Sequence, residues 1–311
     1  MAFLEPKFEI PFKSQWNKDL DAYDGDVLKA REAYLGMAAG FNSRMPDPNT
    51  LVEEYEDKFI FRADKAPAGL KAYGAEQLIA ETEEDVLVYV APRTGHAPDA
   101  IATLANMYGK RCVFFCPASK SASDHQAAML GHGNVDLRFV RIAAMPVLNQ
   151  YAKEWAEQNG AKFLPFGLTG SPLVTAGLIR MCDDISTVIN GTVCAVSTGT
   201  MIRALQIGFP NVQHYGMAVA RNIKAGEIGH ASVISSYQAF QQKAKIPPPF
   251  PSTATYDAKA WDLFEMLDIP GSMFINVGSD DMITSGLKGV DRSEIDSARE
   301  WGDHRDIQRS I

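Results

Sequence analysis

The sequence has 311 residues, of which 46% are hydrophobic and 22% are charged, and these proportions are typical of a soluble globular protein rather than a disordered one. Thirty basic residues against 38 acidic ones give a net charge of -8, which disfavours general binding to the phosphate backbone of nucleic acids. No apolar run approaches the roughly 20 residues needed to cross a bilayer, and the N-terminus lacks a signal-peptide pattern, so we expect a cytoplasmic protein without membrane association.

The first fifty residues are polar, with a helical pattern over 26–37, and we expect them to form a cover or a dimer arm. Residues 59–61 are typical of a short strand that leads to a helix beginning near Lys71. The chain then alternates between two kinds of element, which we predict as strands at 86–91, 112–116, 137–140, 192–196, 214–219 and 273–277, and helices at 98–108, 122–130, 147–158, 172–181, 200–207 and 257–267. A loop rich in proline occupies 243–256, and 291–311 form a charged tail. This alternation predicts an α/β fold with mostly parallel sheets flanked by helices.

The length allows one large domain or two moderate ones, and we predict two lobes. Residues 1–80 together with 165–311 are expected to form a large cofactor-binding domain. Residues 81–164 are expected to form a small inserted α/β domain.

The cysteines and most histidines favour structural roles. We expect buried free thiols, because no further pair of metal-ligating side chains lies close in sequence to complete a tetrahedral site; the four residues are Cys112, Cys116, Cys182 and Cys194. Five histidines have no metal-ligand spacing, namely His125, His132, His214, His230 and His304. The sequence therefore predicts no metal site.

One loop has the form of an anion-binding site. Ser197, Thr198, Gly199 and Thr200 follow a buried strand and open a helix, which offers free backbone N–H groups and hydroxyls to a phosphate. The simpler alternative is a hydroxyl N-cap without a ligand. The position after a parallel strand favours a ligand, because open α/β sheets bind ligands at that edge.

Two further segments contain candidate functional residues. Lys71 lies between a glycine-containing loop and a helix, where a lysine opposes the helix dipole, and its amine could act as a nucleophile. Thr94, Gly95 and His96 connect a strand to a helix and could bind a carboxylate. For each of these features an ordinary surface role is the alternative. Lys259 is a lesser rival to Lys71, and we expect it on a helix surface.

Taken in order, these segments resemble the fold-type II family of pyridoxal-phosphate enzymes, the tryptophan synthase β-like group that includes threonine synthase, dehydratases and aminocyclopropane-carboxylate deaminase. The likeness covers about 49–281. The motifs that carry the likeness are Gly69-Leu70-Lys71-Ala72-Tyr73-Gly74, Thr94-Gly95-His96-Ala97-Pro98, Val196-Ser197-Thr198-Gly199-Thr200 and Tyr256-Asp257-Ala258-Lys259-Ala260.

The resemblance implies a two-lobed fold with twisted, mostly parallel sheets, and pyridoxal 5'-phosphate as the cofactor. Lys71 would bind the cofactor covalently and move the proton at the substrate Cα. The other implied contacts fall into three sets: Thr94, Gly95 and His96 at the substrate carboxylate, with His96 also at the cofactor O3′; Ser197, Thr198, Gly199 and Thr200 at the phosphate; and Asn276 or Ser279 at the pyridine nitrogen. The spacing does not decide between Asn276 and Ser279.

Two loops depart from the family pattern. His96 stands where asparagine is usual, Ala97-Pro98 replaces His-Gly, and the phosphate loop has one glycine instead of three or four. The resemblance implies a cytoplasmic homodimer that acts on an amino acid or an amino-acid-like group by β-elimination or β-replacement. The alternatives are decarboxylation or another Cα reaction on an unusual substrate, and a non-catalytic relative that serves as a binding or partner subunit.

Overall fold

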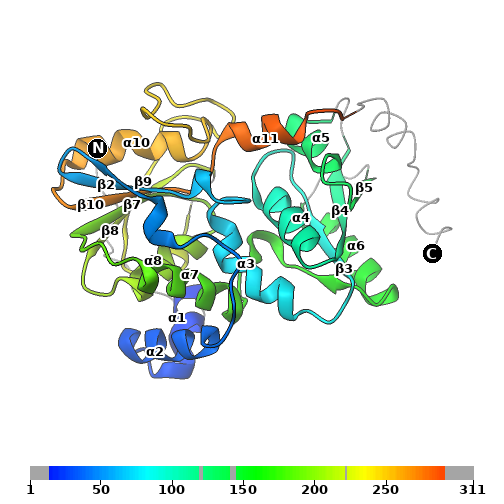
Figure 1. The fold of residues 1–311 in the computed structure, drawn as a ribbon, viewed down its shortest axis with the longest axis horizontal. Helices are drawn as coiled ribbons and strands as arrows, with labels where there is room; N and C mark the ends of the chain where they lie inside the picture. The colour runs from blue at the N-terminus through cyan, green and yellow to red at the C-terminus, as the bar shows by residue number, and fades with distance from the viewer. Residues whose placement is uncertain (1–13, 119–121, 141–144, 221–222, 291–311) are drawn as a thin grey trace. The chain divides into compact units, whose positions relative to one another are not determined.

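A computed structural model describes residues 14–118, 122–140, 145–220 and 223–290, so the predicted tail at 291–311 lies outside the described residues. The chain divides into two compact units (Figure 1). Within the described part, the first unit contains 14–77 and 169–280, and the second contains 78–168 and 281–290. No helix in the described ranges is long and apolar enough to span a membrane.

The first unit is built on a six-stranded sheet with the order β1-β2-β10-β7-β8-β9. The strands are β1 (Val52–Tyr55), β2 (Lys58–Arg62), β7 (Gly191–Val196), β8 (Gln213–Ala218), β9 (Ser232–Ser235) and β10 (Ser272–Asn276). All neighbours pair in parallel except β1 and β2, which are antiparallel. The residues that follow β2, β10 and β7 therefore leave the sheet at one common edge.

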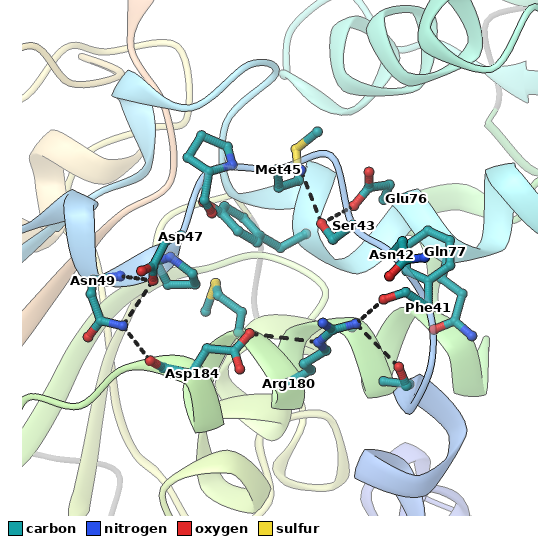
Figure 2. Close-up of a pocket in the computed structure, with 16 residues that line it drawn as sticks. Phe41, Asn42, Ser43, Met45, Asp47, Asn49, Glu76, Gln77, Arg180 and Asp184 are labelled. Atoms are coloured by element: carbon teal, nitrogen blue, oxygen red, sulfur yellow. Dashed lines mark hydrogen bonds and ion pairs between the residues drawn. The ribbon is translucent and has the colours of Figure 1, made fainter.

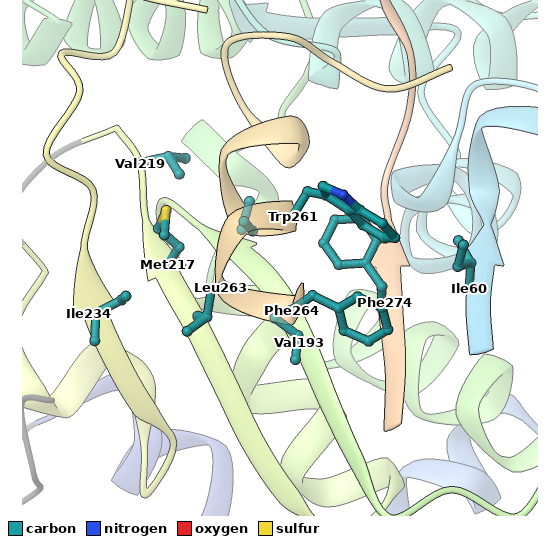
Figure 3. Close-up of a cluster of buried hydrophobic side chains, with 11 residues drawn as sticks. Ile60, Val193, Met217, Val219, Ile234, Trp261, Leu263, Phe264 and Phe274 are labelled. Carbon is teal, nitrogen blue, oxygen red and sulfur yellow. The ribbon is translucent and has the colours of Figure 1, made fainter. Parts of the chain in front are cut away.

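Helices cover both faces of this sheet (Figure 1). The helices of this unit are α1 (Gln15–Leu20), α2 (Val27–Ala38), α3 (Leu70–Glu81), α7 (Pro172–Asp184), α8 (Thr200–Gly208), α9 (Ala225–Ile228) and α10 (Asp257–Leu267), of which α3 ends in the second unit. Of these, α2 packs on α7 and α8, and α1 packs on α9. On one face, α10 packs its apolar side against β7, β8 and β10. Figure 3 shows Trp261 and Phe264 of α10 beside Phe274 of β10, and the Trp261 and Phe274 ring centroids are 5.3 Å apart.

The N-terminal helices belong to the body of the first unit. Trp16 of α1 and Tyr34 of α2 share a buried apolar cluster with Ile179 of α7 and Ile207 of α8. Tyr34 also donates a hydrogen bond from its hydroxyl to the Asp19 carbonyl. The helices of residues 15–38 therefore pack against the body of the first unit, and a role of the N-terminal residues as a cover or a dimer arm stays a prediction.

The second unit contains a four-stranded, fully parallel sheet with the order β5-β4-β3-β6. Its elements are β3 (Val86–Val90), α4 (Ala97–Met107), β4 (Arg111–Pro117), α5 (Asp124–Leu130), β5 (Val135–Val140), α6 (Met145–Gln158), β6 (Lys162–Phe163) and α11 (Asp280–Gly286). The helix α11 packs tightly on α5, because a Cβ added to Gly131 would lie 2.3 Å from the Gly286 carbonyl oxygen. This contact explains why 281–290 group with the second unit, whereas the prediction assigned them to the large domain.

The predicted α/β class is confirmed, and the predicted strands and helices are present with shifts of a few residues at their ends. Two short edge strands of the first sheet, β1 and β9, were not predicted. The four cysteines are free and buried, as expected. Short or irregular edge strands carry little periodic signal, because too few residues alternate between the two faces.

Candidate functional site

Lys71 is positioned by a strained turn between β2 and α3. Ala68 and Gly69 both have positive φ, 62° and 68°, which is costly for alanine and permitted for glycine. The backbone N–H of Leu70 donates to the carbonyl of Val277, 3.0 Å away, just beyond the end of β10. The first turn of α3, which carries Lys71, is therefore fixed to the carboxyl edge of the first sheet.

The Lys71 amine has no hydrogen bond or ion pair with any described residue, and its side chain is half-buried. Burial lowers the pKa of this amine, and the nearby Asp257 carboxylate opposes part of that effect. A lowered pKa leaves more of the amine in its neutral form near pH 7. Lys71 is thus a lysine suited to nucleophilic and proton-transfer chemistry.

Asp257, the first residue of α10, is fully buried. Burial raises the pKa of its carboxyl group well above the usual value, with a smaller contribution from Asp280. Lys71 and the backbone N–H groups of Val277 and Gly278 lower it, yet neither carboxyl oxygen has a partner with hydrogen-bond geometry in the described part of the chain. An unpartnered buried carboxyl group is costly, so it indicates a role beyond folding.

Sequence reasoning did not identify Asp257. An acidic residue at the start of a helix usually does no more than complement the helix dipole, so its position alone carried no special signal. The adjacent Tyr256 lies in the same enclosed region, and burial, followed by the charges of Asp257 and Cys194, raises the pKa of its hydroxyl. The tertiary fold thus places the Asp257 carboxyl group near Lys71 and the Tyr256 phenol near Asp257.

The predicted phosphate loop lies between β7 and α8. Gly199 is the N-cap of α8 and has a φ of 75°, and no side chain caps the helix. Behind the loop, the guanidinium of Arg203 donates to the carbonyls of Thr198 (3.2 Å) and Glu227 (2.7 Å) and to the Asp19 carboxylate (2.6 Å). The backbone N–H groups of the first turn are therefore presented by a braced loop, as an anion site requires.

Only glycine fits at the centre of that loop. A Cβ at position 199 would lie 1.8 Å from the Glu227 carbonyl oxygen and 2.8 Å from Nη1 of Arg203. The side chains of Ser197, Thr198 and Thr200 are half-buried, and the hydroxyl oxygens of Thr198 and Thr200 are 3.2 Å apart. The loop thus combines one obligatory glycine with three hydroxyl groups.

The two candidates for the pyridine contact differ in their surroundings. Asn276 ends β10, and its amide nitrogen donates to the Asp64 carboxylate (2.7 Å) and to the Pro251 carbonyl (2.9 Å). Its carbonyl oxygen is buried and has no partner in the described ranges. Ser279 is buried, three residues farther along. Asn276 therefore has a structural role through its amide nitrogen, and its oxygen remains available as an acceptor.

Thr94, Gly95 and His96 belong to the second unit, after β3 and before α4. His96 is the N-cap residue of α4 and is buried, and its ring makes an edge-to-face contact with His125 at 5.4 Å. The Gly95 N–H donates to Nδ1 of His125 across 3.4 Å. His125 of α5, which was expected to have a structural role, therefore contacts this loop. The role of Thr94, Gly95 and His96 toward a substrate stays a prediction.

Lys259 is buried, which shows that the expectation of a surface position was wrong. Its ammonium donates to the carbonyls of Ala239 (2.8 Å) and Phe240 (3.1 Å), and burial lowers its pKa. The loop that precedes α10 therefore packs over the helix, and two of its backbone carbonyls bind the Lys259 ammonium. Within the described ranges, no three His, Cys, Asp or Glu residues gather as metal ligands.

Comparisons with known proteins place the fold. No family model and no curated protein matches the chain. Among solved structures, an ACC deaminase homologue aligns with a TM-score of 0.62 and 18% identity, over 83% of this chain and 99% of the other. Escherichia coli diaminopropionate ammonia lyase aligns with a TM-score of 0.54 and 14% identity, over 92% and 96%. A pyridoxal 5'-phosphate-dependent aspartate racemase aligns with a TM-score of 0.51 and 12% identity, over 81% and 94%. The chain therefore has the α/β fold of these enzymes, as its motifs predicted.

Proposed function

We propose that this protein is a pyridoxal-phosphate-dependent enzyme that acts on an amino acid or an amino-acid-like group, by β-elimination or β-replacement. The observation that carries the proposal is the amine of the half-buried Lys71 beside the unpartnered carboxyl group of Asp257. Such strongly perturbed pairs cluster at functional sites. Two proteins of similar structure, an ACC deaminase homologue and a diaminopropionate ammonia lyase, support the same reaction class.

The residues present fit the cofactor in three respects. Lys71 offers an amine without a hydrogen-bond partner in the described part of the chain. The uncapped N-terminus of α8, with Ser197, Thr198, Gly199 and Thr200, would hold the phosphate. The buried oxygens of Asp257 and Asn276 lack donors in the described ranges, and a ring nitrogen that carries a hydrogen would supply one.

When bound, pyridoxal phosphate supplies a carbonyl carbon that reacts with amines and a ring that withdraws electrons from the substrate Cα. Lys71 would hold the cofactor through its neutral amine and would take the proton from the substrate Cα. We favour the carboxyl group of Asp257 as the partner of the ring nitrogen. Asn276 and Ser279, which the family resemblance indicates for this role, are the alternatives. Burial of Lys71 also keeps water from competing with the substrate for this amine.

A spectroscopic experiment tests the proposal. Purified protein incubated with pyridoxal phosphate should show a visible absorbance band that borohydride abolishes, and peptide mapping should place the reduced adduct on Lys71. Lys259 is the internal control, because its pKa is also lowered but its amine is engaged by two carbonyls. Absence of a band, or an adduct on Lys259, would refute the proposal and leave a fold relative that serves as a binding or partner subunit.

The reaction class needs a second assay, in which holoenzyme is offered amino acids that carry a leaving group at Cβ. Release of a keto acid and ammonia indicates elimination, whereas carbon dioxide release would show the alternative decarboxylation. Thr94, Gly95 and His96 remain proposed for the substrate carboxylate. Substitution of Thr94 by valine should therefore raise the KM of a reactive amino acid more than it lowers kcat.

We also propose a homodimer, which the family resemblance supports, and a cytoplasmic location. Sedimentation velocity of the purified protein tests the first, and a mass near 34.0 kDa would refute it. Localisation of a tagged chain in its native cell tests the second.

A further inference from the structure

The first unit contains a cavity with a volume of about 520 Å³. It is lined by the segment 41–49, by α3 and by α7, and none of the residues assigned above to the cofactor line it (Figure 2). Its volume falls within the range of small-molecule sites. Its lining combines one arginine, several carboxylates and an apolar wall.

The walls of this cavity are held by hydrogen bonds. Nη1 of Arg180 donates to the Phe41 carbonyl at 2.6 Å (Figure 2). The buried carboxylate of Glu76 accepts the Arg44 backbone N–H at 2.6 Å. These bonds attach the segment 41–49 to α7 and α3. The cavity is therefore preformed, which lowers the entropic cost of binding a ligand.

Two carboxylates at the cavity repel each other. Burial raises the pKa of Asp184, Arg180 lowers it, and the charges of Asp183 and Asp47 raise it further. Asp47 is held in its ionised form by hydrogen bonds from Asn49, which lower its pKa. The Asn49 amide nitrogen donates both to the Asp47 carboxylate (2.9 Å) and to the Asp184 carbonyl (2.6 Å), so the two acidic residues lie at one end of the cavity. An ammonium group bound at that end would meet their carboxylates.

Arg180 supplies the opposite charge. Its Nε lies 3.7 Å from the Asp184 carboxylate, and its Nη1 donates to the carbonyls of Ala38 and Phe41. Its Nη2 has no partner in the part of the chain that the structure describes. Two N–H donors of the guanidinium thus remain for an anion, and a carboxylate is its preferred partner. Met45 and Met181 add an adaptable apolar wall.

We propose that this cavity binds a free amino acid with an apolar side chain, as an effector site separate from Lys71. The ammonium group would lie between Asp47 and Asp184, and the carboxylate would meet Arg180. Binding affects Lys71 through α3, which carries Lys71 in its first turn and Tyr73 and Glu76 in the cavity wall.

The packing of α3 on α7 supports this coupling. A Cβ added to Gly177 would lie 2.4 Å from the Tyr73 carbonyl oxygen, and one added to Gly74 would lie 2.9 Å from Leu178. The backbones of the two helices therefore meet at Gly177 and Tyr73, and the Leu178 and Val174 side chains pack against Gly74 beside that point. A ligand held between α3 and α7 would therefore displace α3 as a rigid element.

Calorimetric titration of the cofactor-free full chain with L-methionine and L-leucine tests the site. Matched probes are 3-(methylthio)propylamine, which lacks the carboxylate, and 4-(methylthio)butanoate, which lacks the ammonium. We expect both probes to bind at least about fivefold more weakly than L-methionine, and Asp184→Asn to weaken L-methionine about fivefold, which is ~1 kcal/mol. Glu54→Gln, an exposed carboxylate elsewhere on the first unit, should leave the affinity unchanged.

The result separates this site from the proposed active site, because Lys71→Ala should bind L-methionine as the unaltered chain does. Loss of binding in Lys71→Ala with retention in Asp184→Asn would place the ligand at the active site and overturn the inference. Absence of binding by both amino acids would overturn it as well. The coupling has its own readout: saturating L-methionine should change the rate at which acetic anhydride modifies Lys71, and an unchanged rate would refute the route through α3.

Discussion

Replacement of Asp257 by asparagine should make the cofactor-free protein more stable. The side chain is fully buried, both carboxyl oxygens lack hydrogen-bond partners in the described ranges, and burial raises its pKa. Removal of an unsatisfied buried charged group recovers about 1–3 kcal/mol. At ~2–4 °C per kcal/mol for a domain of this size, the melting temperature should rise by roughly 2–12 °C.

The pH dependence of this gain follows from the direction of the shift. Because the pKa of Asp257 is raised in the folded state, the unfolded chain releases this proton at a lower pH than the folded chain does. The cost of the carboxyl group is therefore absent below the ordinary aspartate pKa of about 3.9 and grows as the pH rises above it. The stabilisation by Asp257→Asn should be largest near neutral pH and should shrink toward pH 4.

Thermal melts of the cofactor-free proteins at several pH values provide the measurement, with Asp57→Asn as the control because Asp57 is exposed. The opposite effect is expected with pyridoxal phosphate present, since Asp257→Asn should weaken cofactor binding and reduce the stabilisation that the cofactor gives. A cofactor-free Asp257→Asn variant that melts lower than the original chain, or a gain that is equal at pH 4 and pH 7, would refute the reasoning.

Three other predictions concern the proposed phosphate loop, the arginine that supports it, and Lys71. Gly199→Ala should cost about 2–4 kcal/mol in unfolding free energy, because the new methyl group meets the Glu227 carbonyl at a positive φ; unchanged denaturant melts would contradict this. Arg203→Met should cost about 3–5 kcal/mol by leaving the buried Asp19 unpaired, and adding Asp19→Leu should recover part of it; additive losses in the cycle would show that the pair is not coupled. Acetic anhydride should modify Lys71 at a lower pH than it modifies exposed lysines, because burial lowers the pKa of Lys71; equal pH profiles by mass spectrometry would refute the lowered pKa.

The unpartnered carboxyl group has a functional interpretation that links these predictions. Natural sites often contain groups that destabilise the unliganded fold and are satisfied only when a ligand binds. Asp257 and the oxygen of Asn276 are two such groups beside the end of β10. The increase in stability that removal of Asp257 should bring is thus the counterpart of its proposed contact with the cofactor.

The sequence by itself determined the element order and the α/β class, and it singled out Lys71 as a candidate. Strands and helices are local patterns, so buried runs such as 192–196 and amphipathic runs such as 257–267 predict them without knowledge of the fold. The loop proposed to bind phosphate could be predicted for the same reason, since a strand, a short polar loop and a helix N-terminus are adjacent along the chain.

Only the tertiary structure placed Asp257 beside Lys71 and buried Lys259. Both depend on how α10 packs on the sheet, and no local pattern encodes a contact between residues so distant in sequence. The carboxyl group of Asp257 resembles an ordinary helix start, and Lys259 resembles an ordinary surface lysine, until the chain folds around them. Desolvation, which gives these groups their altered pKa values, is a property of the packed state and has no signature in sequence.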